Sequence, residues 1–229
     1  MKRIALAVVL LGSPATPTWA GYDEGVAAYD RGDYPTAVRE FEESAAQGDA
    51  HAQLFLGVMY DRGSGMARDY ATAATWYRRA AEQGVARAQF NLGVMTERGE
   101  GVAQDYAEAA DWYRRAAKQD HARAQFSLGV LYGIGQGVPQ DFIEAASWYR
   151  LAASQGIARA MNNIGLLYQQ GLGVPLDLTK AYAWYSQAVS HYRPGPPKEQ
   201  AVRNRDGVAN ELSPQQLERA TIRGRRLGW

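Results

Sequence analysis

Four aspartates recur at a fixed interval, and carboxylates at a repeated position are candidates for acid–base catalysis or cation binding. They lie 36 residues apart, at Asp69, Asp105, Asp141 and Asp177. Each precedes a segment of helical periodicity, and Asp105 and Asp141 are followed three residues later by Glu108 and Glu144. This spacing is typical of a capping box, in which carboxylates satisfy unpaired N–H groups at a helix start. We therefore interpret the aspartates as helix caps rather than catalytic acids.

Other reactive groups are scarce. The chain has no cysteine, which excludes thiol catalysis, disulfides and cysteine-ligated zinc. Its three histidines, His51, His121 and His191, fall at different phases of the pattern and predict no shared metal site. The sequence contains no H-E-x-x-H, G-x-S-x-G or S-x-x-K motif. We expect no enzymatic activity, no metal and no cofactor.

Arginines form a second recurring set, and their chemistry suits binding. Arg87, Arg123 and Arg159 keep the same spacing of 36 residues, and a polar residue follows each of them one helical turn later. Those polar residues are Asn91, Ser127 and Asn163. Guanidinium and amide groups together can hold the carbonyls or acidic side chains of an extended peptide. The alternative is a solvated helix face on which the arginines provide solubility.

These candidates belong to a larger pattern with the same period. Trp-Tyr dipeptides stand at 76–77, 112–113, 148–149 and 184–185, and Leu-Gly or Ile-Gly lies 19 residues before each Trp. A Gly-x-Gly segment falls between them, beginning at Gly63, Gly99, Gly135 and Gly171. A fixed period of this length indicates one supersecondary unit copied end to end. We place the four units at 49–84, 85–120, 121–156 and 157–190.

Each unit contains two segments of helical spacing. Ala88, Leu92 and Met95 form one apolar stripe, and Ala109 and Tyr113 begin another. The Gly-x-Gly between them can adopt positive φ, end the first helix and let the chain turn back. A phosphate-binding loop is disfavoured because the glycines follow a helix rather than a strand.

Glycine and aromatic residues inside the helices predict packing. A mid-helix glycine costs about 1 kcal/mol relative to alanine, so its recurrence at Gly57, Gly93, Gly129 and Gly165 indicates close approach of the paired helix. The Trp-Tyr pairs could form a ligand-stacking ladder. Their constant phase on the second helix favours packing against the neighbouring repeat.

The arrangement Ala…Leu-Gly…Tyr…Gly-x-Gly-Val…Asp…Ala…Trp-Tyr…Ala-Ala…Gln-Gly resembles the Sel1-like repeat, a relative of the tetratricopeptide repeat. The resemblance implies an all-α fold, an α/α right-handed superhelix (solenoid) of helical hairpins. It also implies that the first helices, with Arg87, Arg123 and Arg159, line the concave surface. Three positions depart from the pattern: Thr96 replaces a tyrosine, Asp120 replaces the linking glycine, and Gly133 is an additional glycine.

The N-terminus reads as an export signal over residues 1–20. Lys2 and Arg3 precede the apolar stretch Ile4–Leu11, and Thr18-Trp19-Ala20 offers small residues at a cleavage site. The alternative, an uncleaved anchor, would need about 17 or more apolar residues. We expect a periplasmic or secreted bacterial protein that does not insert into a membrane after cleavage and has no nucleic-acid partner.

Two flanking segments complete the chain. Residues 21–48 look like one tetratricopeptide-like repeat stacked on the first unit. Residues 191–229 carry eight Arg/Lys against four Asp/Glu, in a chain of net charge +1. They read as a proline-rich linker at 193–197, followed by capping helices over Gln200–Leu212 and Pro214–Arg226. A polar terminal hairpin would cover the last apolar face of a solenoid.

These features predict a non-enzymatic adaptor or regulator of the cell envelope. Its partner would be an envelope protein or peptide segment, bound in the concave groove at Arg87, Asn91, Arg123, Ser127, Arg159 and Asn163. The resemblance adds that such proteins often restrain sensor kinases or scaffold envelope assemblies. The alternative is a protein that acts on peptidoglycan or another carbohydrate, which paired carboxylates outside the capping positions would favour.

Overall fold

The computed structural model describes residues 20–227, and this range contains helices and no strands. The predicted signal segment 1–20 therefore lies outside the described residues, apart from Ala20. The helices are α1 (Ala20–Asp30), α2 (Tyr34–Ala46), α3 (Ala50–Arg62), α4 (Tyr70–Glu82), α5 (Ala86–Arg98), α6 (Tyr106–Ala117), α7 (Ala122–Ile134), α8 (Phe142–Ser154), α9 (Ala158–Gln170), α10 (Leu178–His191), α11 (Pro196–Glu211) and α12 (Pro214–Leu227). None of these helices is long and apolar enough to span a bilayer.

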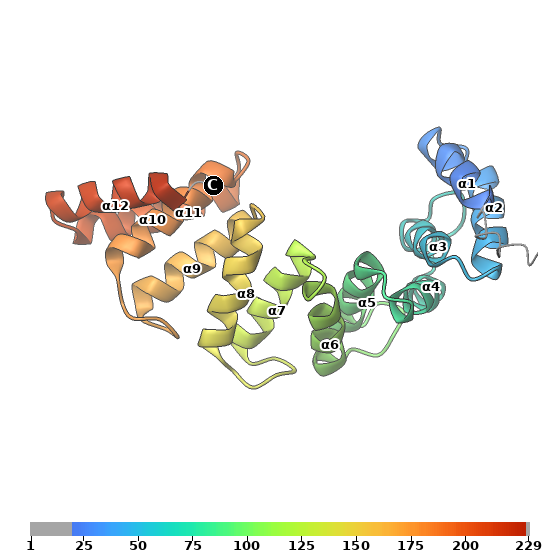
Figure 1. Cartoon of the computed structure of the whole chain (residues 1–229), viewed down its shortest axis with the longest axis horizontal. Helices are drawn as coiled ribbons and strands as arrows, with labels where there is room; N and C mark the ends of the chain where they lie inside the picture. The colour runs from blue at the N-terminus through green and yellow to red at the C-terminus, as the bar shows by residue number, and fades with distance from the viewer. Residues whose placement is uncertain (1–19, 228–229) are drawn as a thin grey trace, which may run out of the picture.

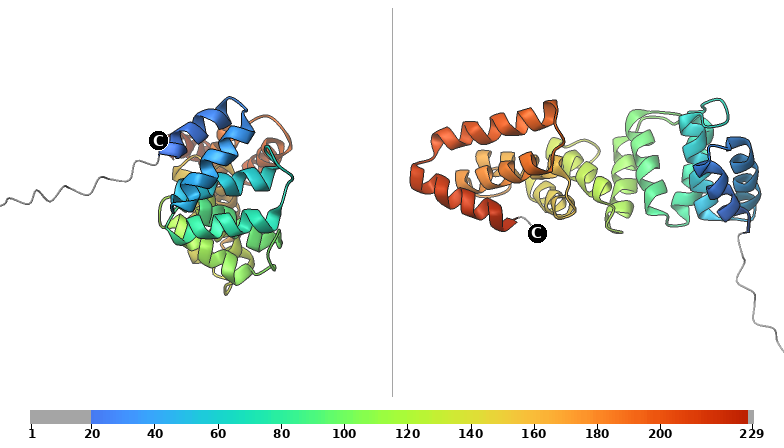
Figure 2. Two further views of the ribbon diagram at one scale, coloured as in Figure 1. Left: turned by 90° about the vertical axis from the view of Figure 1, so that its right-hand side faces the viewer. Right: turned by 90° about the horizontal axis from the view of Figure 1, so that it is seen from above.

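Successive hairpins stack into a curved rod. Each first helix packs on its own hairpin partner and on the second helix of the preceding hairpin. Figure 1 shows the hairpins following one another along an arc whose two ends rise on the same side, and Figure 2 shows the rod from its end and from above. The predicted all-α solenoid is confirmed.

The repeated aspartates begin the second helices, as predicted. Asp105 accepts hydrogen bonds from the backbone N–H of Ala107 (2.8 Å) and of Glu108 (3.0 Å). The predicted capping box does not close, however, because the Asp105 N–H already donates to the Thr96 carbonyl (3.0 Å). Glu108 instead accepts from Arg78 of the preceding repeat (3.0 Å) and from the Trp112 indole (3.1 Å). A predicted local contact is thus replaced by one that joins two repeats.

The Gly-x-Gly segments both end a helix and join two repeats. Gly99 follows α5 with φ 71°, so the first glycine provides the predicted left-handed C-cap. Gly101 also has φ 71°, and a Cβ built on it would lie 2.2 Å from the carbonyl carbon of Tyr70 in the preceding repeat. The second glycine is therefore needed for close backbone contact between repeats.

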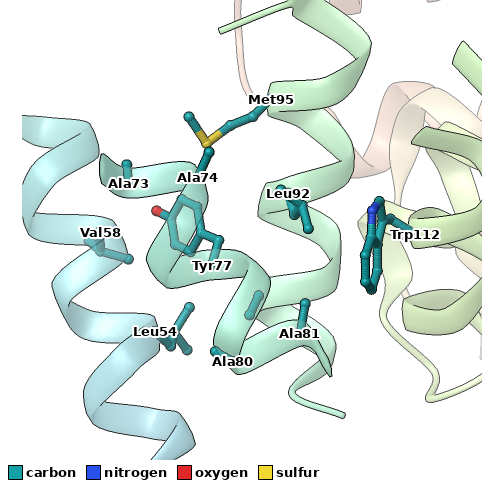
Figure 3. Close-up of a cluster of buried hydrophobic side chains, with 11 residues drawn as sticks. Leu54, Val58, Ala73, Ala74, Tyr77, Ala80, Ala81, Leu92, Met95 and Trp112 are labelled. Atoms are coloured by element: carbon teal, nitrogen blue, oxygen red, sulfur yellow. The ribbon is translucent and has the colours of Figure 1, made fainter. Parts of the chain in front are cut away.

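The mid-helix glycines make room for the tyrosines of the Trp-Tyr pairs. A Cβ on Gly93 would lie 2.8 Å from two ring carbons of Tyr113, which is fully buried. Figure 3 shows the equivalent Tyr77 between the helices of its hairpin, with Trp112 of the next hairpin on the far side of Leu92. The predicted packing role of both aromatic residues is confirmed in this core cluster.

Buried glutamines add polar contacts between repeats. Gln89 donates to the Ala81 carbonyl of the preceding repeat (3.1 Å) and accepts from Gln119 in the turn after α6 of its own repeat (2.9 Å). Gln53 and Gln125 make the equivalent pairs of bonds. An unpaired buried polar group would destabilise the fold, so these bonds favour the one stacking register in which every glutamine is paired.

The ends of the rod differ from one another. The N-terminal hairpin α1/α2 packs on α3, and its assignment as a tetratricopeptide-like repeat stays a prediction. At the C-terminus, α11 begins at Pro196, four residues before the predicted start. The prolines fit the first turn because the N–H groups there need no helical partner.

The two C-terminal helices do not form the expected hairpin. Both α11 and α12 pack on α10, more extensively than on each other. Ser213 and Gln216 form a complete capping box at the start of α12, as predicted.

Candidate functional site

The first helices line two adjoining hollows, which together we call the groove. The larger, of about 610 Å³, lies over α5, α7 and α9, and the smaller, of about 340 Å³, over α3, α5 and the start of α7. Phe90, Arg123 and Ile157 line both. Figure 1 shows the first helices α3 and α5 on the inner side of the arc and the second helices α4 and α6 on its outer side.

The groove gathers most of the residues that the sequence predicted for binding. Arg87 and Asn91 line the smaller hollow, Ser127 and Arg159 line the larger one, and Arg123 lines both. Asn163 lines neither hollow and lies against the hydroxyl of Tyr149. The three arginines come from successive first helices, one at the first turn of each.

The three arginines are available for a ligand. Arg87, Arg123 and Arg159 are exposed, and among residues 21–224 they take part in no ion pair. The predicted polar residues Asn91 and Ser127 are half-buried instead. The groove thus presents unpaired positive charge at its rim, with smaller polar groups deeper inside.

Tyrosine hydroxyls explain why the polar residues are half-buried. The Tyr77 hydroxyl donates to Asp61 of its own repeat (3.3 Å). Burial, and then the charge of Asp61, raise the pKa of Tyr77, whereas a hydrogen bond from Asn91 in the next repeat lowers it. In the following unit the Tyr113 hydroxyl donates to Glu97. A hydrogen bond from Ser127 of the next repeat lowers the pKa of Tyr113, as Asn91 does for Tyr77.

The predicted polar residues Asn91, Ser127 and Asn163 therefore lie at the contact between repeats. Each lowers the pKa of a buried tyrosine in the preceding repeat. The sequence alone gave no sign of this contact because the residues involved come from different helices.

Phe90, Phe126 and Ile157 of the groove were not predicted from the sequence. Phe90, Phe126, Val94, Val130 and Ile157 line the larger hollow between the arginines. The recurrence of Phe90 and Phe126 at an interval of 36 residues, next to the arginine stripe, was the available signal. A cationic rim around an apolar floor suits a peptide that carries both acidic and apolar side chains.

His121 is a further groove residue that the sequence analysis set aside. Its ring stacks on Phe90, with ring centroids 4.7 Å apart, and its Nδ1 accepts the N–H of Ala124 (3.2 Å) as a helix cap. Burial, and then the charges of Arg123 and Arg87, lower the pKa of His121. The lowered pKa of His121 favours the neutral imidazole beside the groove arginines.

Several residues that could carry other chemistry have structural roles in the described part of the chain. Between residues 20 and 227, no group of three His, Asp or Glu side chains could hold a metal ion. The repeated aspartates are occupied by helix N–H groups, and Trp112 is 7% exposed within the core. The arrangement can recognise a ligand through charge, hydrogen bonds and apolar contact.

The repeat pattern matches a known family model. The Sel1 repeat matches residues 50–85, 86–121, 122–157 and 158–191, which together make up more than half of the chain. The chain belongs to the Sel1 repeat family. The matched units begin one residue after the predicted ones. The predicted resemblance to the Sel1-like repeat is confirmed.

Solved structures of Sel1-repeat proteins share this fold. A Sel1 repeat protein from Oxalobacter formigenes is 33% identical, with 85% of this chain and 86% of that chain covered, at a TM-score of 0.72. The protein c5321, a protective antigen of uropathogenic Escherichia coli strains, is 32% identical at a TM-score of 0.79. The match covers 91% of this chain but only 44% of c5321. No curated protein matches the sequence significantly.

Membership of the family bears on the class of function. Sel1 repeats generally serve as protein–protein interaction modules, and the family is typically a non-catalytic scaffold. A protein partner is therefore the class of ligand that this fold supports.

Proposed function

We propose that this Sel1-repeat protein is a non-enzymatic adaptor or regulator that binds an extended segment of a partner protein in the groove. The observation that carries the proposal is the row of unpaired arginines, Arg87, Arg123 and Arg159, around a floor of apolar side chains. Charge-assisted hydrogen bonds from arginine suit acidic side chains and backbone carbonyls, and the apolar floor suits alternate aliphatic residues.

The proposal places the protein and its partner in the bacterial envelope. The support for this location is the sequence of residues 1–20, which has the features of an export signal. Asn91, Ser127 and Asn163 contribute smaller polar contacts beside the tyrosine hydroxyls.

The test is capture of envelope proteins by the purified protein and by two triple variants. Arg87→Ala, Arg123→Ala and Arg159→Ala together remove the groove charges. Each contact of a charged group contributes about 1.5–3 kcal/mol, so we expect captured partners to be lost. The melting temperature should hardly change, because exposed positions contribute little to folding.

The control variant removes three charges on the side of the second helices, at Arg79 of α4, Lys118 directly after α6 and Arg150 of α8, which are exposed and outside the groove. Arg78 and Arg114 are unsuitable as controls, because Arg78 pairs with Glu108 and Arg114 bonds the Tyr132 hydroxyl of the next repeat. The control should retain capture. Loss of capture by the control, with capture retained by the groove variant, would place the binding surface on the outer face.

A further inference from the structure

One repeat lacks a side chain that its neighbours use inside the groove. In three repeats the thirteenth residue of the unit accepts the tyrosine hydroxyl, and these residues are Asp61, Glu97 and Gln169. The equivalent residue of the unit 121–156 is Gly133. Its partner would be Tyr149, and among residues 21–224 no acceptor takes the proton of the Tyr149 hydroxyl.

The space left by the missing side chain is open to the Tyr149 hydroxyl. A Cβ on Gly133 would lie 3.5 Å from that oxygen, which is ordinary contact. Tyr149 is 5% exposed, whereas Tyr77 is 1% exposed and Tyr113 and Tyr185 are fully buried. The vacant position therefore uncovers a phenol that the other repeats keep covered.

Asn163 completes the surroundings of this hydroxyl. Burial raises the pKa of Tyr149, and a hydrogen bond from the Asn163 side chain lowers it. The Tyr149 hydroxyl oxygen also borders the space over Gly133. We call this space, bounded by Gly133, the Tyr149 hydroxyl and Asn163, the Gly133 notch.

The notch adjoins the groove. Val130 lines the larger hollow, and Gly133 lies three residues later on the same face of α7. Arg159 lines the same hollow, one turn before Asn163 on α9. A ligand in the groove can therefore reach the notch under the influence of unpaired positive charge.

The neighbouring repeats show which group fits. In two of them the tyrosine hydroxyl donates to a carboxylate, that of Asp61 or that of Glu97. We propose that the Gly133 notch receives an acidic side chain of the bound segment, whose carboxylate accepts the hydrogen bond of the Tyr149 hydroxyl. This inference rests on the proposed function, since it requires that the groove binds a peptide.

The test uses peptides selected from a phage-displayed library of random peptides on the purified protein. Selected sequences are synthesised with a fluorophore, and their Kd is measured by fluorescence anisotropy. We expect them to share an Asp or Glu, and replacement of that residue by its amide should weaken binding about tenfold or more.

Three variants locate the subsite. Gly133→Glu supplies the acceptor that Glu97 provides in the preceding repeat, so it should fold normally and weaken peptide binding about tenfold or more. Tyr149→Phe removes the donor with little change of shape and should also weaken binding. Arg150→Ala is the control, because this residue is exposed on the neighbouring helix α8 and lies outside the groove, so Kd should stay unchanged.

The outcomes separate this inference from the proposed function. Peptides that lose binding in the Arg87, Arg123 and Arg159 triple variant but bind Gly133→Glu normally would overturn the notch alone. Selected peptides that are indifferent to both changes, or a library that yields no binder, would overturn the groove and the notch together. Amide replacement that weakens binding to the unmodified protein but not to Gly133→Glu would support the assigned contact directly.

Discussion

Gly129→Ala and Gly133→Ala add the same methyl group to α7 one turn apart, and we expect them to change stability in opposite directions. Alanine is favoured over glycine inside a helix by about 1 kcal/mol, and part of this gain also applies at Gly133, which lies in the last turn of α7. The two variants differ in what the new methyl group meets. Both glycines face Tyr149, so one side chain serves as the reference for both.

The magnitudes follow from the contacts. At Gly129 the Cβ would lie 2.7 and 2.8 Å from two ring carbons of Tyr149 and 3.3 Å from the Ala145 carbonyl oxygen. The ring is buried and cannot retreat, and overpacking of this kind costs about 1–3 kcal/mol. We therefore expect Gly129→Ala to lose up to about 2 kcal/mol net. Gly133→Ala, at 3.5 Å from the hydroxyl, should gain up to about 1 kcal/mol.

Guanidinium unfolding followed by far-ultraviolet circular dichroism measures both free energies, and a double-mutant cycle tests the cause. In a Tyr149→Val background the clash is removed, so Gly129→Ala should become stabilising by about 1 kcal/mol. Equal stabilisation by Gly129→Ala and Gly133→Ala in the original background would refute the packing role assigned to the mid-helix glycines.

Three further outcomes are expected. Trp112→Ala should cost about 3–5 kcal/mol as a large-to-small change in the core, and the half-buried Trp76→Ala should cost less, as thermal melts can show. The free energy of unfolding should fall as the pH drops from about 7 to about 5. In the unfolded chain His121 takes up a proton near its ordinary pKa of about 6.5, whereas in the folded protein its lowered pKa disfavours protonation. His121→Asn, which can still cap α7, should flatten that dependence in denaturant melts repeated across the range. Deletion of 85–120 should leave a shorter folded protein and deletion of 85–102 should not, and equal helicity of the two would contradict the repeat boundaries.

Much of the fold was predictable because its determinants repeat. Asp105 as a cap, Gly99 as a helix end and the Trp-Tyr pairs as packing residues each recur at a constant phase. A constant phase in a stacked array means a constant environment. Local chemistry then decides among few options, since only glycine readily adopts the positive φ that ends each first helix.

Two predictions were wrong, one because a residue has partners in another repeat and one because a proline was taken for a helix breaker. Glu108 has the spacing of a capping box, yet the N–H that it would bond is already taken by Thr96, and Arg78 lies within reach. The start of α11 was placed too late because Pro196 reads as a breaker in sequence, although a helix tolerates proline in its first turn. Spacing within one unit carries no information on such contacts.

The candidate site divides in the same way between repeated and unrepeated residues. Arg87, Arg123 and Arg159 were found because they recur, and the structure places them along one groove. Residues that recur in every unit build the same local environment, so they give the groove its general character. They cannot distinguish one partner from another along its length.

Recognition of a particular segment must therefore depend on positions where one unit departs from the others. Gly133 is such a position, because it replaces a hydrogen-bond acceptor that the other repeats provide. The exposed apolar side chain of Ile134, 54% exposed beside it, stands where the two preceding units carry Arg62 and Arg98. The unit 121–156 thus combines an unused donor with an apolar neighbour inside a cationic groove. Exchange of residues 133–134 for the Glu-Arg of positions 97–98 would make this unit like the preceding one. A peptide whose position along the groove depends on Gly133 and Ile134 should then no longer bind in a single register.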